Sequence, residues 1–192
     1  MMTPEEHKAR TARSYKLLLI FAMISMTMMF AGLTSALVVS KSRPDWLKDF
    51  QMPSSFFIST AIILLASLTI HLAKKAIKAD DRTKTTLFLW LTLALGLGFV
   101  YFQFQGFGQL LQSHLYPTGG AGSITIAFLY ILVYVHLAHL SGGIISLLII
   151  IYNHFKQKYN SSQFLGIELG AMYWHFLDFL WIYLFLFLYF FK

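Results

Sequence analysis

The chain of 192 residues contains no cysteine, and only 12% of its residues are charged. The lack of cysteine excludes disulfides, thiolate metal ligands and thiol catalysis. The scarcity of charge, together with a hydrophobic content of 57%, excludes an ordinary soluble domain, which does not need so much apolar surface. The surroundings of this protein must themselves be apolar, so its hydrophobic runs decide the fold class.

Five hydrophobic runs are long enough to cross a bilayer, since about 20 apolar helical residues span a hydrocarbon core of about 30 Å. The runs cover residues 17–39, 53–73, 87–111, 124–152 and 164–191 and leave little chain for a soluble domain. None has the alternation of a barrel strand, and helices satisfy their own backbone hydrogen bonds in lipid. The first run exceeds the about 7–15 apolar residues of a signal peptide. The sequence predicts one all-α domain, an integral membrane bundle of five transmembrane helices.

The net charge of +7 is unevenly placed along the chain. The N-terminal tail and the second and fourth connections carry Lys8, Arg10, Arg13, Lys16, Lys74, Lys75, Lys78, Arg82, Lys84, Lys156 and Lys158. The opposite side carries Lys41, Arg43, Lys48 and Lys192. Basic residues concentrate on the cytoplasmic side of membrane proteins, so this asymmetry predicts a cytoplasmic N-terminus and a C-terminus outside. The same placement argues against a nucleic-acid partner.

Two ionisable side chains lie inside the last hydrophobic run. His175 and Asp178 are three residues apart and share one face of a helix. An ionisable group within a span costs about 2.5–3.5 kcal/mol on insertion scales, so this face should point into protein. An acid in a dry bundle must pair or stay protonated. We predict that Asp178 hydrogen-bonds to His175, His136 or His139 and holds the fifth helix against the fourth.

The histidines permit two other interpretations. His136 and His139 could share a metal ligand, but zinc or copper needs three or four donors. A di-iron bundle needs Glu-x-x-His pairs on two helices, and the only acids in or near the runs are Glu168 and Asp178. A proton relay competes with the structural network, yet the titratable groups do not form an obvious ladder. The expected site is therefore a structural polar network that holds no metal or cofactor.

Small and polar residues predict where helices approach closely. The third run contains Gly96, Gly98, Gly106 and Gly108, and the first run is also rich in small residues, which let membrane helices pack tightly. Gln103, in the third run, is expected to hydrogen-bond to another helix. The first and third runs are thus predicted to make close helix contacts.

Four motifs, in order along the chain, resemble the cytochrome c oxidase subunit III family. The segment Tyr173-Trp-His-Phe-Leu-Asp-Phe-Leu-Trp181, which includes Trp174, resembles the family's Tyr-Trp-His-Phe-Val-Asp-x-x-Trp segment. The other motifs are His136-x-x-His139 with Gly143, Leu95-Gly96 with Phe99 and Gln103, and Ser25 with Met28, Phe30-Ala-Gly32 and Ser35. Five spans match the short bacterial form. Two family glutamates are replaced, by Met26 and by Gly106, so functions of those carboxylates are in doubt here.

The resemblance implies a non-catalytic third subunit of a haem–copper terminal oxidase in aerobic electron transport. The implied location is the inner membrane of a bacterium, and the implied partners are oxidase subunits I and II, with subunit IV also considered. Haem and copper are expected in those partners and not in this chain, whereas bound phospholipids are expected here. The implied roles are assembly, oxygen access to the catalytic subunit and sustained proton uptake. An accessory subunit of a nitric oxide reductase and a stand-alone transporter remain alternatives.

Overall fold

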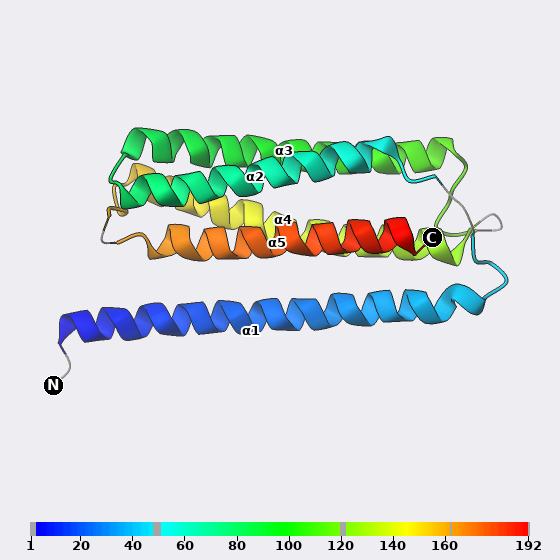
Figure 1. Ribbon diagram of the computed structural model, residues 1–192, viewed down its shortest axis with the longest axis horizontal. Helices are drawn as coiled ribbons and strands as arrows, with labels where there is room; N and C mark the ends of the chain where they lie inside the picture. Colours follow the sequence, from blue (N-terminus) through cyan, green and yellow to red (C-terminus); the bar gives the residue numbers. More distant parts are fainter. Residues whose placement is uncertain (1–2, 48–50, 120–121, 162, 192) are drawn as a thin grey trace.

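The computed structural model describes residues 3–47, 51–119, 122–161 and 163–191. This part of the chain contains five long helices, with no β-structure beyond two isolated bridges (Figure 1). The helices are α1 (Pro4–Val39), α2 (Ser54–Lys78), α3 (Arg82–Gln112), α4 (Ile124–Phe155) and α5 (Leu165–Phe190). Each is long and apolar enough to cross a membrane, which confirms the predicted all-α class and the five spans.

A capping box explains why the first helix starts earlier than its hydrophobic run. The Thr3 hydroxyl accepts a hydrogen bond from the Glu6 amide, and the Glu6 carboxylate accepts one from the Thr3 amide. These reciprocal bonds satisfy two amides that a helix start leaves without partners. The polar tail before residue 17 therefore belongs to α1, which is 36 residues long.

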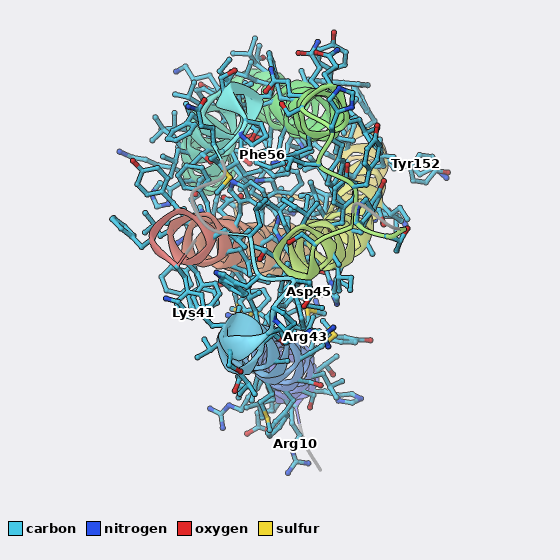
Figure 2. All side chains as sticks on the ribbon, turned by 90° about the vertical axis from the view of Figure 1, so that its right-hand side faces the viewer. Arg10, Lys41, Arg43, Asp45, Phe56 and Tyr152 are labelled. Atoms are coloured by element: carbon cyan, nitrogen blue, oxygen red, sulfur yellow. The ribbon has the colours of Figure 1, made fainter. Side chains whose placement is uncertain are left out.

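Helices α2 to α5 form a closed bundle, and α1 lies outside it. In ring order, α2 packs on α3, α3 on α4, α4 on α5, and α5 on α2. Figure 2 shows this ring end-on, with α1 placed beside α4 and α5. The most extensive contact joins α2 and α3, which are consecutive in sequence and connected by a short turn.

The predicted close packing of the first run is wrong within this chain. A Cβ atom added at Gly32 would meet no atom within 4 Å, and most of α1 is exposed. Phe30, Thr34 and Leu37 are its buried side chains among the described residues. Small residues permit close approach but do not require it, so α1 stays at the edge of the bundle.

The two ends of the bundle differ in charge. The start of α1, the α2–α3 turn and the α4–α5 connection lie at one end, which carries most of the basic residues (Figure 1). At the other end, Arg43 donates two hydrogen bonds to the Asp45 carboxylate, at 2.8 and 3.3 Å. These hydrogen bonds hold the pKa of Asp45 below its ordinary value.

Candidate functional site

The candidate site is the interior of the bundle around residues 173–181 of α5. Trp174 and Trp181 lie two turns apart on one helix face, and each is 1% exposed. The Trp181 ring packs edge-on against Phe99 and Phe56, with centroids 5.1 and 6.2 Å away. Its Nε1 donates a hydrogen bond of 2.9 Å to the hydroxyl of Thr60 in α2. This bond satisfies the buried indole N–H and helps to fix the orientation of the ring, whereas the Nε1 of Trp174 has no partner among the described residues.

Trp174 packs directly onto a glycine of the neighbouring helix α3. A Cβ added at Gly96 would lie 2.8 Å from the Cη2 atom of Trp174, closer than side chains tolerate. A Cβ at Gly106 would overlap the Phe56 ring in the same way. The predicted close packing of the third run is thus confirmed at Gly96 and Gly106, whereas an added Cβ would make only an ordinary 3.9 Å contact at Gly98 and none within 4 Å at Gly108. The glycine at position 106 also leaves no room for the glutamate of the family unless Phe56 moves.

Gln103 makes the expected bond to another helix. Its Nε2 donates to the hydroxyl of Ser59 in α2 at 3.0 Å, and both residues are fully buried. His136 is also fully buried, with its ring 5.9 Å from that of Phe99 and 5.2 Å from that of Trp181. Neither of its ring nitrogens has a hydrogen-bond partner in the described part of the chain. His136 therefore contributes to the core as an aromatic packing element.

The predicted hydrogen bond between Asp178 and a histidine is wrong. The Nδ1 of His175 lies 2.7 Å from the hydroxyl of Ser67 in α2, so this histidine is bonded to a different helix. The Asp178 side chain is buried, and neither of its carboxyl oxygens has a partner among the described residues. His175 and Asp178 share a helix face, but the bond of the imidazole Nδ1 goes to Ser67 and not to Asp178.

His139 also bonds elsewhere. Its Nδ1 lies 2.7 Å from the carbonyl oxygen of Val135, one turn earlier in α4. Its own carbonyl oxygen accepts a hydrogen bond of 3.0 Å from the Tyr173 hydroxyl of α5. The α4–α5 contact thus uses the backbone of His139 and not an ion pair with Asp178.

Hydroxyl groups of α2 are the partners that sequence reasoning missed. Ser59, Thr60 and Ser67 bond to Gln103, Trp181 and His175, which come from α3 and α5. The signal was present in the sequence, because hydroxyl side chains inside a hydrophobic span commonly bond across helices. Residues 173–181 therefore bond to α2 through His175 and Trp181 and to α4 through Tyr173, and Gln103 of α3 also bonds to α2.

The described residues include no group of three or more histidine, aspartate or glutamate side chains that could hold one metal ion. His71 and His175 have ring centroids 6.2 Å apart, and His175 already bonds to Ser67. His136 and His139 are separated by their environments, one in the core and one bonded to its own helix.

Glu168 lies near the basic end of the bundle and joins three helices. Its carboxylate is 2.8 Å from the ammonium of Lys16 in α1 and 3.9 Å from that of Lys74 in α2. Sequence reasoning treated Glu168 only as a possible metal donor. An acid in the first turn of a helix, facing a basic tail, was the signal for this ion pair.

The sequence is similar to those of proteins from one known family. Residues 4–192 match the family described as cytochrome c oxidase subunit III. Cytochrome c oxidase subunit 3 of Thermostichus vulcanus is 32% identical over 179 residues, which cover 90% of this chain and 84% of that protein. The subunit of Bacillus sp. (strain PS3) is 29% identical over 164 residues, with 83% and 77% covered.

An animal relative, subunit 3 of Petromyzon marinus, is 25% identical over 143 residues, and the chain spans about half of its length, 51%. The resemblance inferred from residues 173–181 and the other motifs is thus confirmed over nearly the whole sequence. This chain belongs to the cytochrome c oxidase subunit III family.

Proposed function

We propose that the protein is the non-catalytic third subunit of a respiratory haem–copper terminal oxidase, a cytochrome c oxidase of aerobic electron transport. It would bind oxidase subunits I and II, and in some assemblies subunit IV, in the cytoplasmic membrane of a bacterium. The N-terminus and the basic end of the bundle would face the cytoplasm, and the C-terminus would lie outside.

This proposal rests on the contacts that the family motif, residues 173–181, makes within this chain. Trp174, His175 and Trp181 are occupied by contacts with Gly96, Ser67 and Thr60 of the same chain. The motif thereby holds the bundle together, and the haem and copper chemistry would belong to the partner subunits. A rigid bundle of this kind can support the assembly and stability of a catalytic neighbour.

Two accessory roles follow from grooves beside α1. A groove of about 450 Å³ between α1 and α5 is lined mainly by apolar side chains, including Phe30, Ala31 and Leu180. Molecular oxygen dissolves well in apolar surroundings, so this groove is a candidate path for oxygen toward the catalytic subunit. Phospholipid binding is proposed along the same exposed helix, since most of α1 is apolar and uncovered within this chain.

The first experiment identifies what the protein assembles with. The chain is tagged, extracted in a mild detergent and purified, and a visible spectrum and the masses of the associated subunits are recorded. Haem absorption with cytochrome c oxidase subunits I and II is the expected result. Subunits of a nitric oxide reductase would favour the alternative accessory role. A colourless protein without partners that moves a solute would contradict the proposal.

The second experiment tests orientation. The chain has no cysteine, so a single cysteine placed at Thr118 would be its only thiol. Labelling from the outside of intact cells is expected there, and labelling at Lys156 replaced by cysteine is expected only from the cytoplasm. The reverse pattern would contradict the proposed topology.

A further inference from the structure

The outer side of α2, beside α5, carries a histidine that this chain leaves exposed. Four histidines lie in the hydrophobic runs, at positions 71, 136, 139 and 175. His136 is buried, whereas His139 and His175 are half-buried and hydrogen-bonded within the chain. His71 is the exposed one, and the described residues provide no hydrogen-bond partner for its ring nitrogens. Its ring lies beside that of His175, with the centroids 6.2 Å apart.

The depth of His71 distinguishes it from the lysines at the same end of α2. It lies seven residues before Lys78, the last residue of the helix, which corresponds to about 10 Å along the axis. A lysine can carry its ammonium to the membrane surface on a long apolar stem, but an imidazole is too short to do so. A polar group without a partner is costly in hydrocarbon, so ionisable side chains within spans almost always face protein. Because the bundle of this chain leaves His71 exposed, the protein that covers it must be another chain.

The surroundings of His71 are apolar. Phe57, Leu64 and His71 follow one another at intervals of seven residues and so lie along one side of α2. The Phe57 ring packs on that of Phe185 in α5, with centroids 5.0 Å apart, and Leu64 is 49% exposed. On α5, Phe179 is 72% exposed. The α2–α5 face is defined by these residues: Phe57, Leu64, His71, His175, Phe179 and Phe185.

The α2–α5 face continues into the groove between α1 and α5. Phe179 also lines that groove, and α5 lies between α1 and α2 in the end-on view (Figure 2). An occupant of the α2–α5 face would therefore also cover the mouth of the groove. The apolar side chains alone would suit lipid, but the unpartnered imidazole of His71 would not. The face thus fits a protein helix with a polar side chain better than it fits acyl chains.

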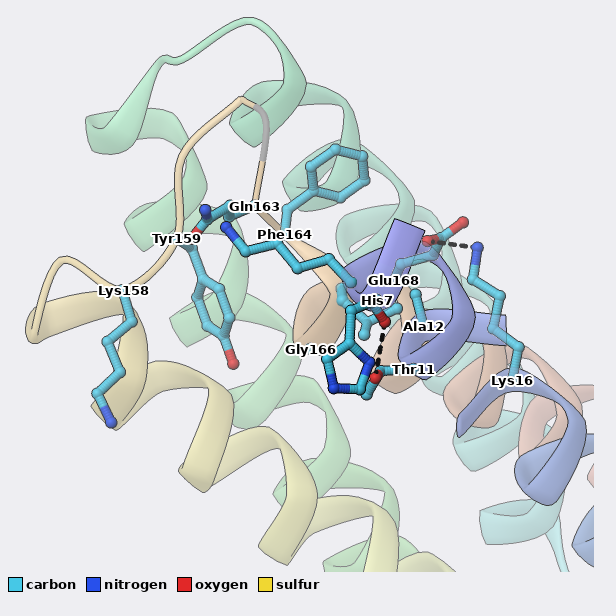
Figure 3. Close-up of a pocket in the computed structure, with 12 residues that line it drawn as sticks. His7, Thr11, Ala12, Lys16, Lys158, Tyr159, Gln163, Phe164, Gly166 and Glu168 are labelled. Atoms are coloured by element: carbon cyan, nitrogen blue, oxygen red, sulfur yellow. Dashed lines mark hydrogen bonds and ion pairs between the residues drawn. The ribbon is translucent and has the colours of Figure 1, made fainter. Parts of the chain in front are cut away.

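The charges beside this face favour an acidic partner. Lys74, one turn after His71, has its ammonium 3.9 Å from the carboxylate of Glu168. Figure 3 shows that Glu168 is already paired with Lys16 of α1, at 2.8 Å. Among the described residues one acid thus serves two lysines. A carboxyl group from outside would complement this arrangement, because it hydrogen-bonds to an imidazole whether ionised or protonated and, when ionised, offsets the charge of Lys74.

We propose that the α2–α5 face docks one transmembrane helix of a partner subunit, and that this helix carries an aspartate or glutamate at the level of His71. The carboxyl group would hydrogen-bond to the His71 imidazole, with Lys74 close by, and the apolar side chains of the helix would pack on Leu64 and Phe179. This inference rests on the proposed function for the presence of partner subunits. It adds the face that they contact and the chemistry by which they are recognised.

The first test is photocrosslinking of the full chain in its native membrane. Leu64 is replaced by the photoreactive amino acid benzoylphenylalanine, and the crosslinked peptides are identified by mass spectrometry. The expected product joins position 64 to a single transmembrane helix of another protein that contains an aspartate or glutamate. The control probe is placed at Leu97 on α3, which is 53% exposed, and should give at least fivefold less of this product.

The second test compares variants of exposed polar side chains. His71→Leu should lower the recovery of the partner with the tagged chain about fivefold, the factor expected for one hydrogen bond between membrane helices. His71→Gln, which keeps a hydrogen-bonding group, should restore most of the recovery. The matched control is Gln105→Leu, because Gln105 is also exposed within a span but bonds to Tyr101 of its own helix, at 2.8 Å. Thermal unfolding of the purified His71→Leu chain should be unchanged, since His71 has no hydrogen-bond partner among the described residues.

The outcomes separate the docking face from the proposed function. A crosslink from position 64 to lipid alone, to a second copy of this chain or to a helix without an acidic residue would overturn the docking proposal, as would equal losses in His71→Leu and Gln105→Leu. If oxidase subunits co-purify while position 64 reaches only lipid, the proposed function stands and the docking face is wrong. If the crosslinked helix carries the acid but belongs to a protein other than an oxidase subunit, the docking face stands and the proposed function is wrong.

Discussion

The imidazole of His175 in α5 is bonded to the hydroxyl of Ser67 in α2, with Nδ1 and Oγ 2.7 Å apart. The bond joins two helices that are far apart in the sequence and adjacent in the ring. It directs the histidine of the family motif toward α2 and leaves Asp178 without a histidine partner. The order of helices around the bundle thus depends on hydroxyl groups of α2 as well as on hydrophobic packing.

Replacing Ser67 with alanine should destabilise the bundle by about 1 kcal/mol, because polar bonds between membrane helices contribute from about 0.6 to 2 kcal/mol. The measurement is unfolding of the purified protein in detergent, followed by circular dichroism. Ser146→Ala is the control, since its half-buried hydroxyl bonds to the Gly143 carbonyl of its own helix. An equal loss in both variants would show that the Ser67–His175 bond contributes nothing specific.

The number and type of the helices could be predicted from sequence, whereas their partners could not. Length and apolar content are local properties, so the five spans follow from the chain alone. Which face of α5 meets which helix depends on the rotation of every helix in the bundle. The sequence therefore predicted that His175 and Asp178 point into the protein, but His175 bonds to Ser67 of α2 and Asp178 bonds to none of the predicted histidines.

Glycines were predicted to mark close helix contacts, and only some do so. Gly96→Ala should cost about 1–3 kcal/mol, because the added methyl group would press on the buried Trp174 ring. Gly98→Ala, on the same helix, should be harmless, since its nearest neighbour would be Ile62 at an ordinary 3.9 Å. The midpoint of thermal unfolding is measured for both variants under the same conditions. Similar midpoints would contradict the proposed packing of Trp174 on α3.

At position 106 this chain has glycine where the family has glutamate, and the neighbouring Phe56 ring accounts for the lack of a side chain there. Because Phe56 occupies the space that a side chain would need, Gly106→Ala should destabilise the protein by about 1–3 kcal/mol. Phe56→Leu should recover part of this loss in the double variant, which a double-mutant cycle would detect as a coupling of about 0.5 kcal/mol or more. Strictly additive effects would mean that Phe56 is not what excludes a side chain from position 106.

The groove between α1 and α5 offers a test of oxygen access. Ala31 is exposed and lines this groove, so Ala31→Phe should fill much of it without disturbing the core. If oxygen uses the groove, the oxidase containing this variant should have a KM for oxygen raised about twofold or more, with kcat unchanged at saturation. Ala36→Phe is the control, because Ala36 is exposed on the same helix and does not line the groove. An unchanged KM in the Ala31 variant would exclude this path.

The last prediction concerns Asp178, whose buried carboxyl has no hydrogen-bond partner in the described part of the chain. Removing a buried polar group that lacks a partner relieves its desolvation and leaves no other group unsatisfied. Asp178→Leu should therefore leave the free energy of unfolding within about 1 kcal/mol of the original, or raise it. Gln103→Leu is the contrasting variant, because it removes the partner of buried Ser59 and should cost about 1–3 kcal/mol. Both are measured in detergent, together with the yield of assembled complex. A marked loss of stability in the Asp178 variant alone would mean that its carboxyl supports the fold through a bond, and that the structural network begins at this acid rather than at His175.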